Sequence, residues 1–254
     1  GAGRFESGYG SDRDDVFIGV DGGSGDFSGT LADTGDVGGL LTIIKVGAGT
    51  QTFSGTSTYA GDLFVRAGTV KVADGGSLSG MRRIDIAGRA TSGDSVSKLI
   101  VEGSVTSGNG GDFGVGSGVA GRGEVIVGNT DGDAVLSIGN GQGAVYVGGE
   151  FSNNSDSERG YGLLTINGGK VTVGAGGSSS GNYDNSRIWF NPWGSHSSSS
   201  SEITINTGGT LETAREIWSG DGSRESILTL NGGVLKATSN ELILVRDGRN
   251  VTVS

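Results

Sequence analysis

The chain has 254 residues, of which 54 are glycine and one is proline, and its 18 basic and 28 acidic residues give a formal net charge of −10. The glycines follow no three-residue period, which excludes a collagen-like helix. The acidic balance without a basic stripe argues against nucleic acid or anionic lipid as partners. The absence of cysteine excludes disulfides, cysteine-ligated zinc and thiol catalysis. No apolar run is long enough to predict a transmembrane helix.

The first part of the chain combines a strand-like run, Asp14 to Val20, with acidic turns. Oxygen ligands for calcium are offered there by Asp12, Asp14, Asp15, Asp21 and Asp26. A second group of this kind consists of Asn129, Asp131 and Asp133. Neither group has a complete calcium-loop spacing, so we interpret both as solvated acidic turns. Bound calcium is the alternative, and no other cofactor is expected.

Short strands closed by glycine follow along the chain. Residues 63–72 (LFVRAGTVKV) and 99–107 (LIVEGSVTS) have a strand–bend–strand outline, and residues 113–148 contain FGVG, VIVG, LSIG and VYVG.

The stretch Gly116 to Gly121 fits the pattern G-x-G-x-x-G, but a strand-like run follows it. Since a dinucleotide site needs a helix N-terminus there, we interpret these residues as turn glycines.

The clearest internal repeats occupy residues 163–254. The copies at 164–171, 203–211 and 228–235 each read apolar, Thr, apolar, Asn, a Gly-Gly bend and a further apolar residue. Alternation with period two predicts a strand with one buried face, and Asn before glycine is typical of a bend. Each copy precedes an apolar patch, at Ile188, Ile217 and Leu242 respectively.

These patterns predict an all-β fold, because no useful glycine-free window has helical apolar spacing. One motif that returns about every 25 to 40 residues with its internal order kept favours a parallel β-helix (β-solenoid) over a sandwich or a propeller. We therefore predict a single elongated domain over residues 1–254, with inserted loops at about 175–187 and 191–202. Stacked coils would place Asn167, Asn206 and Asn231 in a side-chain amide ladder.

The opening residues, GAGRF, and the closing NVTVS, which falls inside a strand-like run, indicate a piece of a longer protein. The first and last coils of a solenoid expose backbone groups and apolar core. We therefore expect these ends to meet further coils of the same chain or the opposite end of another copy.

Residues 39–72 closely resemble the autotransporter-associated β-strand repeat, also called the passenger-associated transport repeat. The positions that match its pattern are Lys45, Gly47, Gly49, Thr50, Ser54, Gly55, Tyr59, Gly61, Val65, Gly68 and Thr69, while Phe53 and Val70 replace leucines. The resemblance implies a right-handed parallel β-helix exported to the bacterial cell surface, in proteins with adhesive or structural roles. It brings no catalytic residues.

Aromatic residues are the strongest ligand-binding candidates. Trp189, Trp193 and Tyr183 lie close together in the sequence, and Trp218 is the equivalent of Trp189 in the next repeat. Aromatic faces pack against sugars, so these residues could contact a surface glycan or matrix. Alternatively they pack in the core or over its edge, which we favour. We expect the inserted loops to protrude from the coils, and two alternatives stay open for them: a binding face or no function.

The sequence offers little support for a catalytic site. His196 is the only histidine and lies in a serine-rich loop, without partners for a triad. Polysaccharide-active enzymes use acidic side chains, often next to basic residues. The candidates of this kind are Glu212 and Glu216 beside Arg215, and Glu225 beside Arg224. We interpret them as outward-facing residues and predict that the protein is not an enzyme.

Three functional hypotheses remain, in this order. The first is an extracellular structural or adhesive surface module, a rigid solenoid stalk or scaffold of an autotransporter-like protein. The second is a subunit of a self-assembling extracellular filament. The third is a polysaccharide-active or glycan-binding β-helix.

Overall fold

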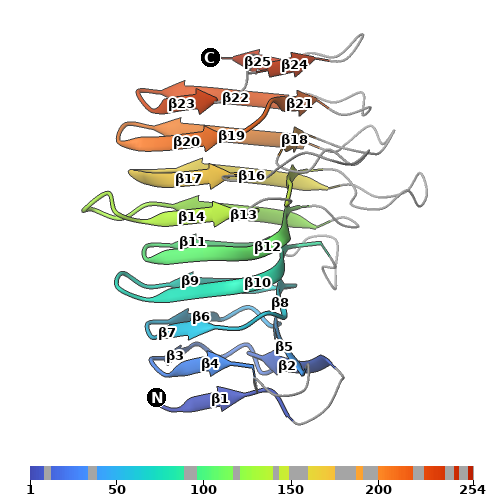
Figure 1. Ribbon diagram of the computed structural model, residues 1–254, viewed down its shortest axis with the longest axis vertical. Helices are drawn as coiled ribbons and strands as arrows, with labels where there is room; N and C mark the ends of the chain where they lie inside the picture. The colour runs from blue at the N-terminus through green and yellow to red at the C-terminus, as the bar shows by residue number, and fades with distance from the viewer. Residues whose placement is uncertain are drawn as a thin grey trace, which may run out of the picture.

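The described residues of the chain form a parallel β-solenoid of 25 strands, stacked along one long axis with the N-terminal coil at one end (Figure 1). This is a computed structural model, and it describes residues 1–8, 13–33, 39–88, 96–116, 121–139, 143–148, 160–174, 187–190, 200–219, 226–237, 243–245 and 251–253. All strand pairs within those ranges are parallel, and none of those residues is helical. The predicted all-β parallel solenoid is confirmed.

Each coil contributes strands to three faces. Face 1 contains β1 (Arg4–Glu6), β4 (Thr30–Ala32), β7 (Thr56–Thr58), the first part of β10 (Ser77–Ile86), the first part of β12 (Ser104–Val115), β14 (Val135–Ile138), β17 (Gly169–Val173), β20 (Gly209–Thr213) and β23 (Val234–Ala237). Face 2 contains β2 (Arg13–Ile18), β5 (Leu40–Lys45), β8 (Asp62–Val65), the remaining parts of β10 and β12, β15 (Val145–Val147), β18 (Ile188–Phe190), β21 (Ile217–Ser219) and β24 (Ile243–Val245). Face 3 contains β3 (Gly25–Phe27), β6 (Thr50–Phe53), β9 (Gly68–Val72), β11 (Val96–Val101), β13 (Arg122–Val127), β16 (Tyr161–Ile166), β19 (Ser200–Asn206), β22 (Ser226–Asn231) and β25 (Val251–Val253).

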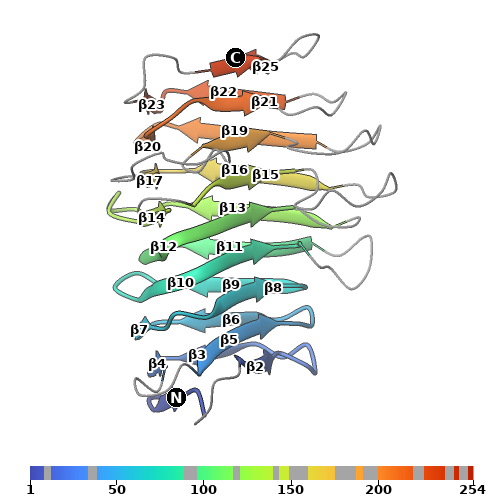
Figure 2. The same ribbon diagram turned by 45° about the vertical axis from the view of Figure 1, so that its right-hand side comes forward.

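Two long strands run around the corner between faces 1 and 2. β10 pairs with β7 through Ser77–Ser79 and with β8 through Arg83–Ile86, and its pairing with β12 shifts register around Met81. An irregularity of this kind bends a strand. Faces 1 and 2 thereby form one 16-stranded sheet, and face 3 is a separate sheet of nine strands. In Figure 2, β5, β8 and β15 of face 2 lie toward the viewer.

The core consists of inward-facing side chains stacked coil upon coil. One such inner column on face 3 runs in register through Val70, Leu99, Val125, Leu164, Ile203 and Leu228, all of which are buried. The alternation of period two in each strand produces this column, because every second side chain points inward. Three of the predicted repeats thus stack on one another at Leu164, Ile203 and Leu228.

Gly68 shows why the corners between faces require glycine. Its φ is +71°, in the left-handed region that other residues rarely adopt. A Cβ at this position would lie 2.3 Å from the carbonyl oxygen of Gly47 and 2.6 Å from that of Gly49. The glycine therefore lets one coil approach the coil before it at this corner.

We expect Gly68→Ala to destabilise the fold more than Gly75→Ala. Gly75 has a similar φ of +74°, but no atom lies within 4 Å of an added Cβ there. Gly75→Ala therefore isolates the left-handed strain of about 1 kcal/mol. Gly68→Ala adds the collision between coils, for which we expect at least about 1 kcal/mol more. Thermal melts of the two variants measure the difference, and equal shifts would contradict the close-approach explanation.

Candidate functional site

An aromatic column runs along the outer surface of face 2. Tyr146 in β15, Trp189 in β18 and Trp218 in β21 occupy one register position in three successive coils. Their strand neighbours Ile188 and Phe190 are buried in the core, whereas the three aromatic side chains are only half-buried. We call these three residues the aromatic column. The repeat spacing noted in the sequence places Trp189 and Trp218 side by side.

Both tryptophans are packed against neighbours. Their ring centroids lie 4.8 Å apart at an interplanar angle of 72°, an edge-to-face geometry that stabilises aromatic pairs. The Arg187 guanidinium lies 4.2 Å from the Trp218 ring centroid, a cation–π distance. Its Nε donates to the Glu216 carboxylate at 2.8 Å. This arrangement agrees with edge packing, and the half-buried rings still leave the column partly open to solvent.

A cluster of charged residues continues face 2 toward the N-terminus. Arg83 forms an ion pair with the buried Asp85 at 2.9 Å. Asp112, which is in register with Arg83, accepts a hydrogen bond from the Ala144 backbone N–H at 3.1 Å. Burial raises the pKa of the Asp112 carboxyl, and burial together with Asp112 raises the pKa of Tyr146. Asp112 therefore links two neighbouring coils next to the aromatic column, whereas the Arg83–Asp85 pair lies within β10.

A second charged cluster surrounds Asp62, which is buried in spite of its outward position on β8. Its carboxylate accepts hydrogen bonds from Arg13 at 3.0 Å and from Arg82 at 2.9 Å. Arg13 and Arg83 also lie over the ring of Phe64, at 5.1 Å and 5.7 Å from its centroid. The cluster therefore joins three coils and covers an outward phenylalanine.

Lys45 occupies an inner position at the corner between faces 2 and 3. Its side chain is buried, and its ammonium donates hydrogen bonds to the carbonyl oxygens of Val46 and Gly47 at 2.7 Å and of Ala67 at 3.3 Å. Burial lowers the pKa of the ammonium. The three carbonyl contacts offset the cost of burying the charge and link two successive corners of the solenoid.

The proposed calcium ligands lie together in the turn between β13 and β14. The Asn129 side-chain oxygen accepts hydrogen bonds from the backbone N–H groups of Gly132 and Asp133, at 2.8 Å and 3.2 Å. Its Nδ2 donates to the Glu102 carbonyl oxygen and to the Asp133 carboxylate. Asn129 thus holds the turn together, with Asp131 exposed beside it. Calcium binding by Asn129, Asp131 and Asp133 stays a prediction.

Across the described part of the chain, no three His, Cys, Asp or Glu side chains gather in a way that could hold a metal ion. Of the carboxylates considered for catalysis, Glu212 and Glu216 belong to separate ion pairs. Glu212 lies on face 1 beside Lys170 at 2.8 Å, which lowers the pKa of that carboxyl, whereas Glu216 lies at face 2 beside Arg187.

Asparagines connect the bends of three coils. Asn206 Nδ2 donates to Asn167 Oδ1 at 2.6 Å, and Asn231 Nδ2 donates to Asn206 Oδ1 at 3.0 Å. The three side chains therefore form a hydrogen-bonded row along the axis, with every amide oriented in the same direction.

Several residues considered from the sequence lie outside the described residues. They are Asp12, Tyr183, Trp193, His196, Arg224 and Glu225, together with most of the loops at about 175–187 and 191–202. Sequence reasoning missed Tyr146, Arg187 and the Asp62 cluster. Tyr146 carried a signal, since the run VYVG places it between two apolar inward positions, as Trp189 is placed in IWF.

The described residues include no helix that could cross a membrane. Neither the curated proteins nor the solved structures include a match to the chain. Residues 43–72, which run from β5 through β9, match the sequence profile of the passenger-associated-transport-repeat. The resemblance predicted for residues 39–72 is thus confirmed, and the chain carries a passenger-associated-transport-repeat in its N-terminal third.

Proposed function

We propose that this chain is a rigid scaffold segment of a secreted, surface-exposed autotransporter passenger, and that face 2 supplies an adhesive contact. The main support for the scaffold role is the parallel strand ladder, which continues through nine strands on face 3. The passenger-associated-transport-repeat at residues 43–72 supports export to the cell surface.

Stiffness is expected because adjacent coils are joined on all three faces. The inner columns bury apolar side chains along the axis, and the asparagine row connects three bends. Ion pairs such as Lys98–Glu124 and Lys170–Glu212 link neighbouring coils on the outside. Exposed ion pairs add little stability, so the stiffness depends mainly on the backbone ladders and the core.

The adhesive part of the proposal depends on the aromatic column. Tyr146, Trp189 and Trp218 repeat at the coil spacing, about 4.8 Å, and their side chains face outward. The exposed parts of aromatic rings offer apolar surfaces to the C–H groups of sugar rings. Because the charges next to them are paired, we expect an uncharged glycan of a cell surface or matrix as the ligand.

The experiment is a glycan array and a cell-binding assay with the parent chain, Trp189→Ala and Phe17→Ala. Phe17 is an exposed aromatic residue on the same face, in the N-terminal coil. We expect Trp189→Ala to weaken binding at least about tenfold, as for an interface hot spot, and Phe17→Ala to bind like the parent. Equal binding by all three proteins would show that the aromatic column does not contact the ligand. A parent chain that binds no glycan and no cell would overturn the adhesive role.

A further inference from the structure

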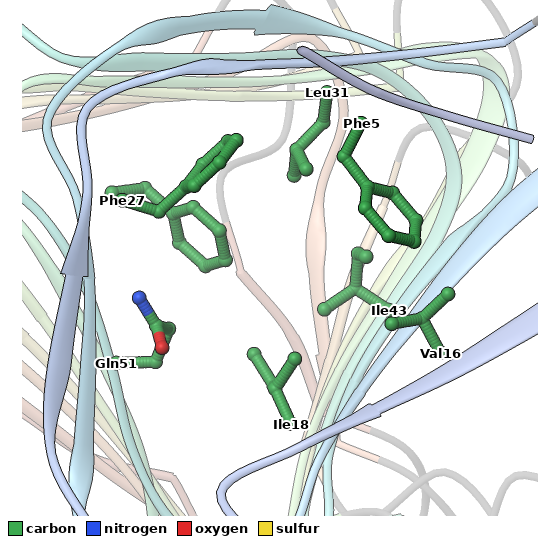
Figure 3. Close-up of a pocket in the computed structure, with 8 residues that line it drawn as sticks. Phe5, Val16, Ile18, Phe27, Leu31, Ile43 and Gln51 are labelled. Carbon is green, nitrogen blue, oxygen red and sulfur yellow. The ribbon is translucent and has the colours of Figure 1, made fainter. Parts of the chain in front are cut away.

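An apolar cavity of about 160 Å³ lies between the coils that contain β1 to β6. Figure 3 shows side chains from all three faces around it. The lining residues are Phe5, Val16, Ile18, Phe27, Leu31, Ile43, Gln51 and Phe53. Apart from Gln51 the lining is apolar, so this cavity lacks the hydrogen-bonding groups that a sugar needs. Polar groups suited to a sugar lie instead on face 2, beside the aromatic column.

The Asp112 carboxylate lies next to Tyr146, the first residue of the aromatic column. Tyr146 is in register with Gly114, and Asp112 precedes Gly114 by two positions on the outer surface of β12. The strand spacing and the rise per residue put the Cα atoms of Asp112 and Tyr146 about 8 Å apart. Gly114 has no side chain to separate them. Burial and, after it, the Asp112 charge raise the pKa of the Tyr146 phenol, which agrees with their proximity.

The two oxygens of the Asp112 carboxylate differ in what they contact. Oδ1 accepts a hydrogen bond from the Ala144 backbone N–H at 3.1 Å. Within the described part of the chain, Oδ2 has no hydrogen-bond partner, and the side chain is only half-buried. Because the Ala144 N–H holds the carboxylate in one orientation, a further bond to Oδ2 costs little additional ordering. Asp112 thus offers a fixed acceptor beside an aromatic ring.

The charged side chains around this position have a small negative excess. Asp85, Asp112 and Glu216 are acidic, whereas Arg83 and Arg187 are basic. Asp85 binds Arg83 and Glu216 binds Arg187, which leaves Asp112 outside the ion pairs of the described residues. An anionic sugar would be repelled here, but a hydroxyl group can donate to the carboxylate.

We infer that Asp112 is a binding residue of the aromatic column, and that its Oδ2 accepts a hydrogen bond from a hydroxyl group of a neutral hexopyranose packed against Tyr146. This inference rests on the adhesive role proposed above and names the class of sugar. A hexopyranose has C–H groups on its face and hydroxyl groups at its edge, so one ring can contact an aromatic side chain and a carboxylate together. An ionised acceptor strengthens the hydrogen bond.

The test uses the 254-residue chain and its variants Asp112→Asn and Asp112→Ala. Binding is measured on an array of glucose, galactose and mannose oligosaccharides and their uronic acid counterparts, and then by isothermal titration calorimetry with the sugars that the parent binds. Asparagine keeps an oxygen for the Ala144 N–H but replaces Oδ2 by an NH₂ group, which cannot accept. It therefore removes the contact with the sugar and preserves the contact with the backbone.

We expect Asp112→Asn to weaken binding of neutral sugars at least about tenfold, as for the loss of a hydrogen bond to a charged group. Hydrogen exchange should show the Ala144 N–H still protected in this variant. Asp112→Ala should lose both the binding and the protection. Glu212→Gln neutralises a carboxylate on face 1, where Glu212 pairs with Lys170, and should bind like the parent.

The outcomes separate this inference from the adhesive role. Parent-like binding by Asp112→Asn, with weakened binding by Trp189→Ala, would overturn the inference and leave the adhesive role standing. In that case a loss confined to Asp112→Ala would show that Asp112 only positions β15. Tighter binding of uronic acid oligosaccharides than of neutral ones would contradict the class of sugar. A parent chain that binds no sugar and no cell would overturn the adhesive role, and this inference with it.

Discussion

Ile166→Asp is expected to unfold the coils around β16 and to lower stability by more than about 4 kcal/mol, since it places a carboxylate in the core without a partner. Ile166 is fully buried, in an inner column between Val127 and Ile205. Chemical denaturation monitored by circular dichroism measures the loss. Thr165→Asp is the matched control, because Thr165 precedes Ile166 in the same strand and is half-buried on the outer surface.

The pH dependence of Ile166→Asp provides an independent check. Burial raises the pKa of the introduced carboxyl above its value in the unfolded chain. The folded variant then binds a proton more readily than the unfolded one, so the stability gap to the parent should narrow as the pH falls from 7 to about 4. A gap that does not change with pH, or an equal loss in Thr165→Asp, would show that the inward and outward positions are wrongly assigned.

Lys45→Met is expected to destabilise the passenger-associated-transport-repeat although it replaces a buried charge with an apolar side chain of similar length. The substitution removes the donor from the carbonyl oxygens of Val46, Gly47 and Ala67. A buried acceptor left without a partner costs about 1–3 kcal/mol, so we expect a loss of roughly 3 kcal/mol in denaturant unfolding.

Lys71→Met is the control for Lys45→Met. Lys71 belongs to the same repeat but pairs with Glu102 on the outer surface, at 2.8 Å and with a third of its side chain exposed. A pair of this kind contributes about 0–1 kcal/mol. Similar stability of Lys45→Met and the parent would mean that water replaces the ammonium at the corner, and that Lys45 is dispensable for joining the two corners.

The sequence predicts the solenoid well because period-two alternation directly encodes which side chains point inward. The copies at Leu164, Ile203 and Leu228 have the same order of residues and stack in register. The same alternation says little about what covers the outer surface. Ile44 and Phe64 point outward and yet are buried, and in the case of Phe64 two arginines from other coils lie over the ring.

Long-range contacts explain most of what sequence reasoning missed. Asp62 meets Arg13, 49 positions away, and Arg82, 20 positions away, and no local pattern connects these residues. Lys45 did carry a signal, because it occupies the inward phase of the run LLTIIK. A lysine at such an inward position indicates a buried ammonium group with carbonyl partners. The family pattern alone shows only that Lys45 matches the repeat, not what its side chain contacts.

The stacking of coils also determines how the rod responds to tension. Among the described residues, the backbone ladders join each coil to the coils above and below it, so a pull along the axis puts the same tension on every ladder in the series. Thr210 pairs with Val234, 24 residues later in the chain. Releasing a coil of that size would lengthen the rod by roughly 80 Å when the segment is fully extended. A tether built in this way would yield in steps at its weakest coil and keep the remaining coils folded.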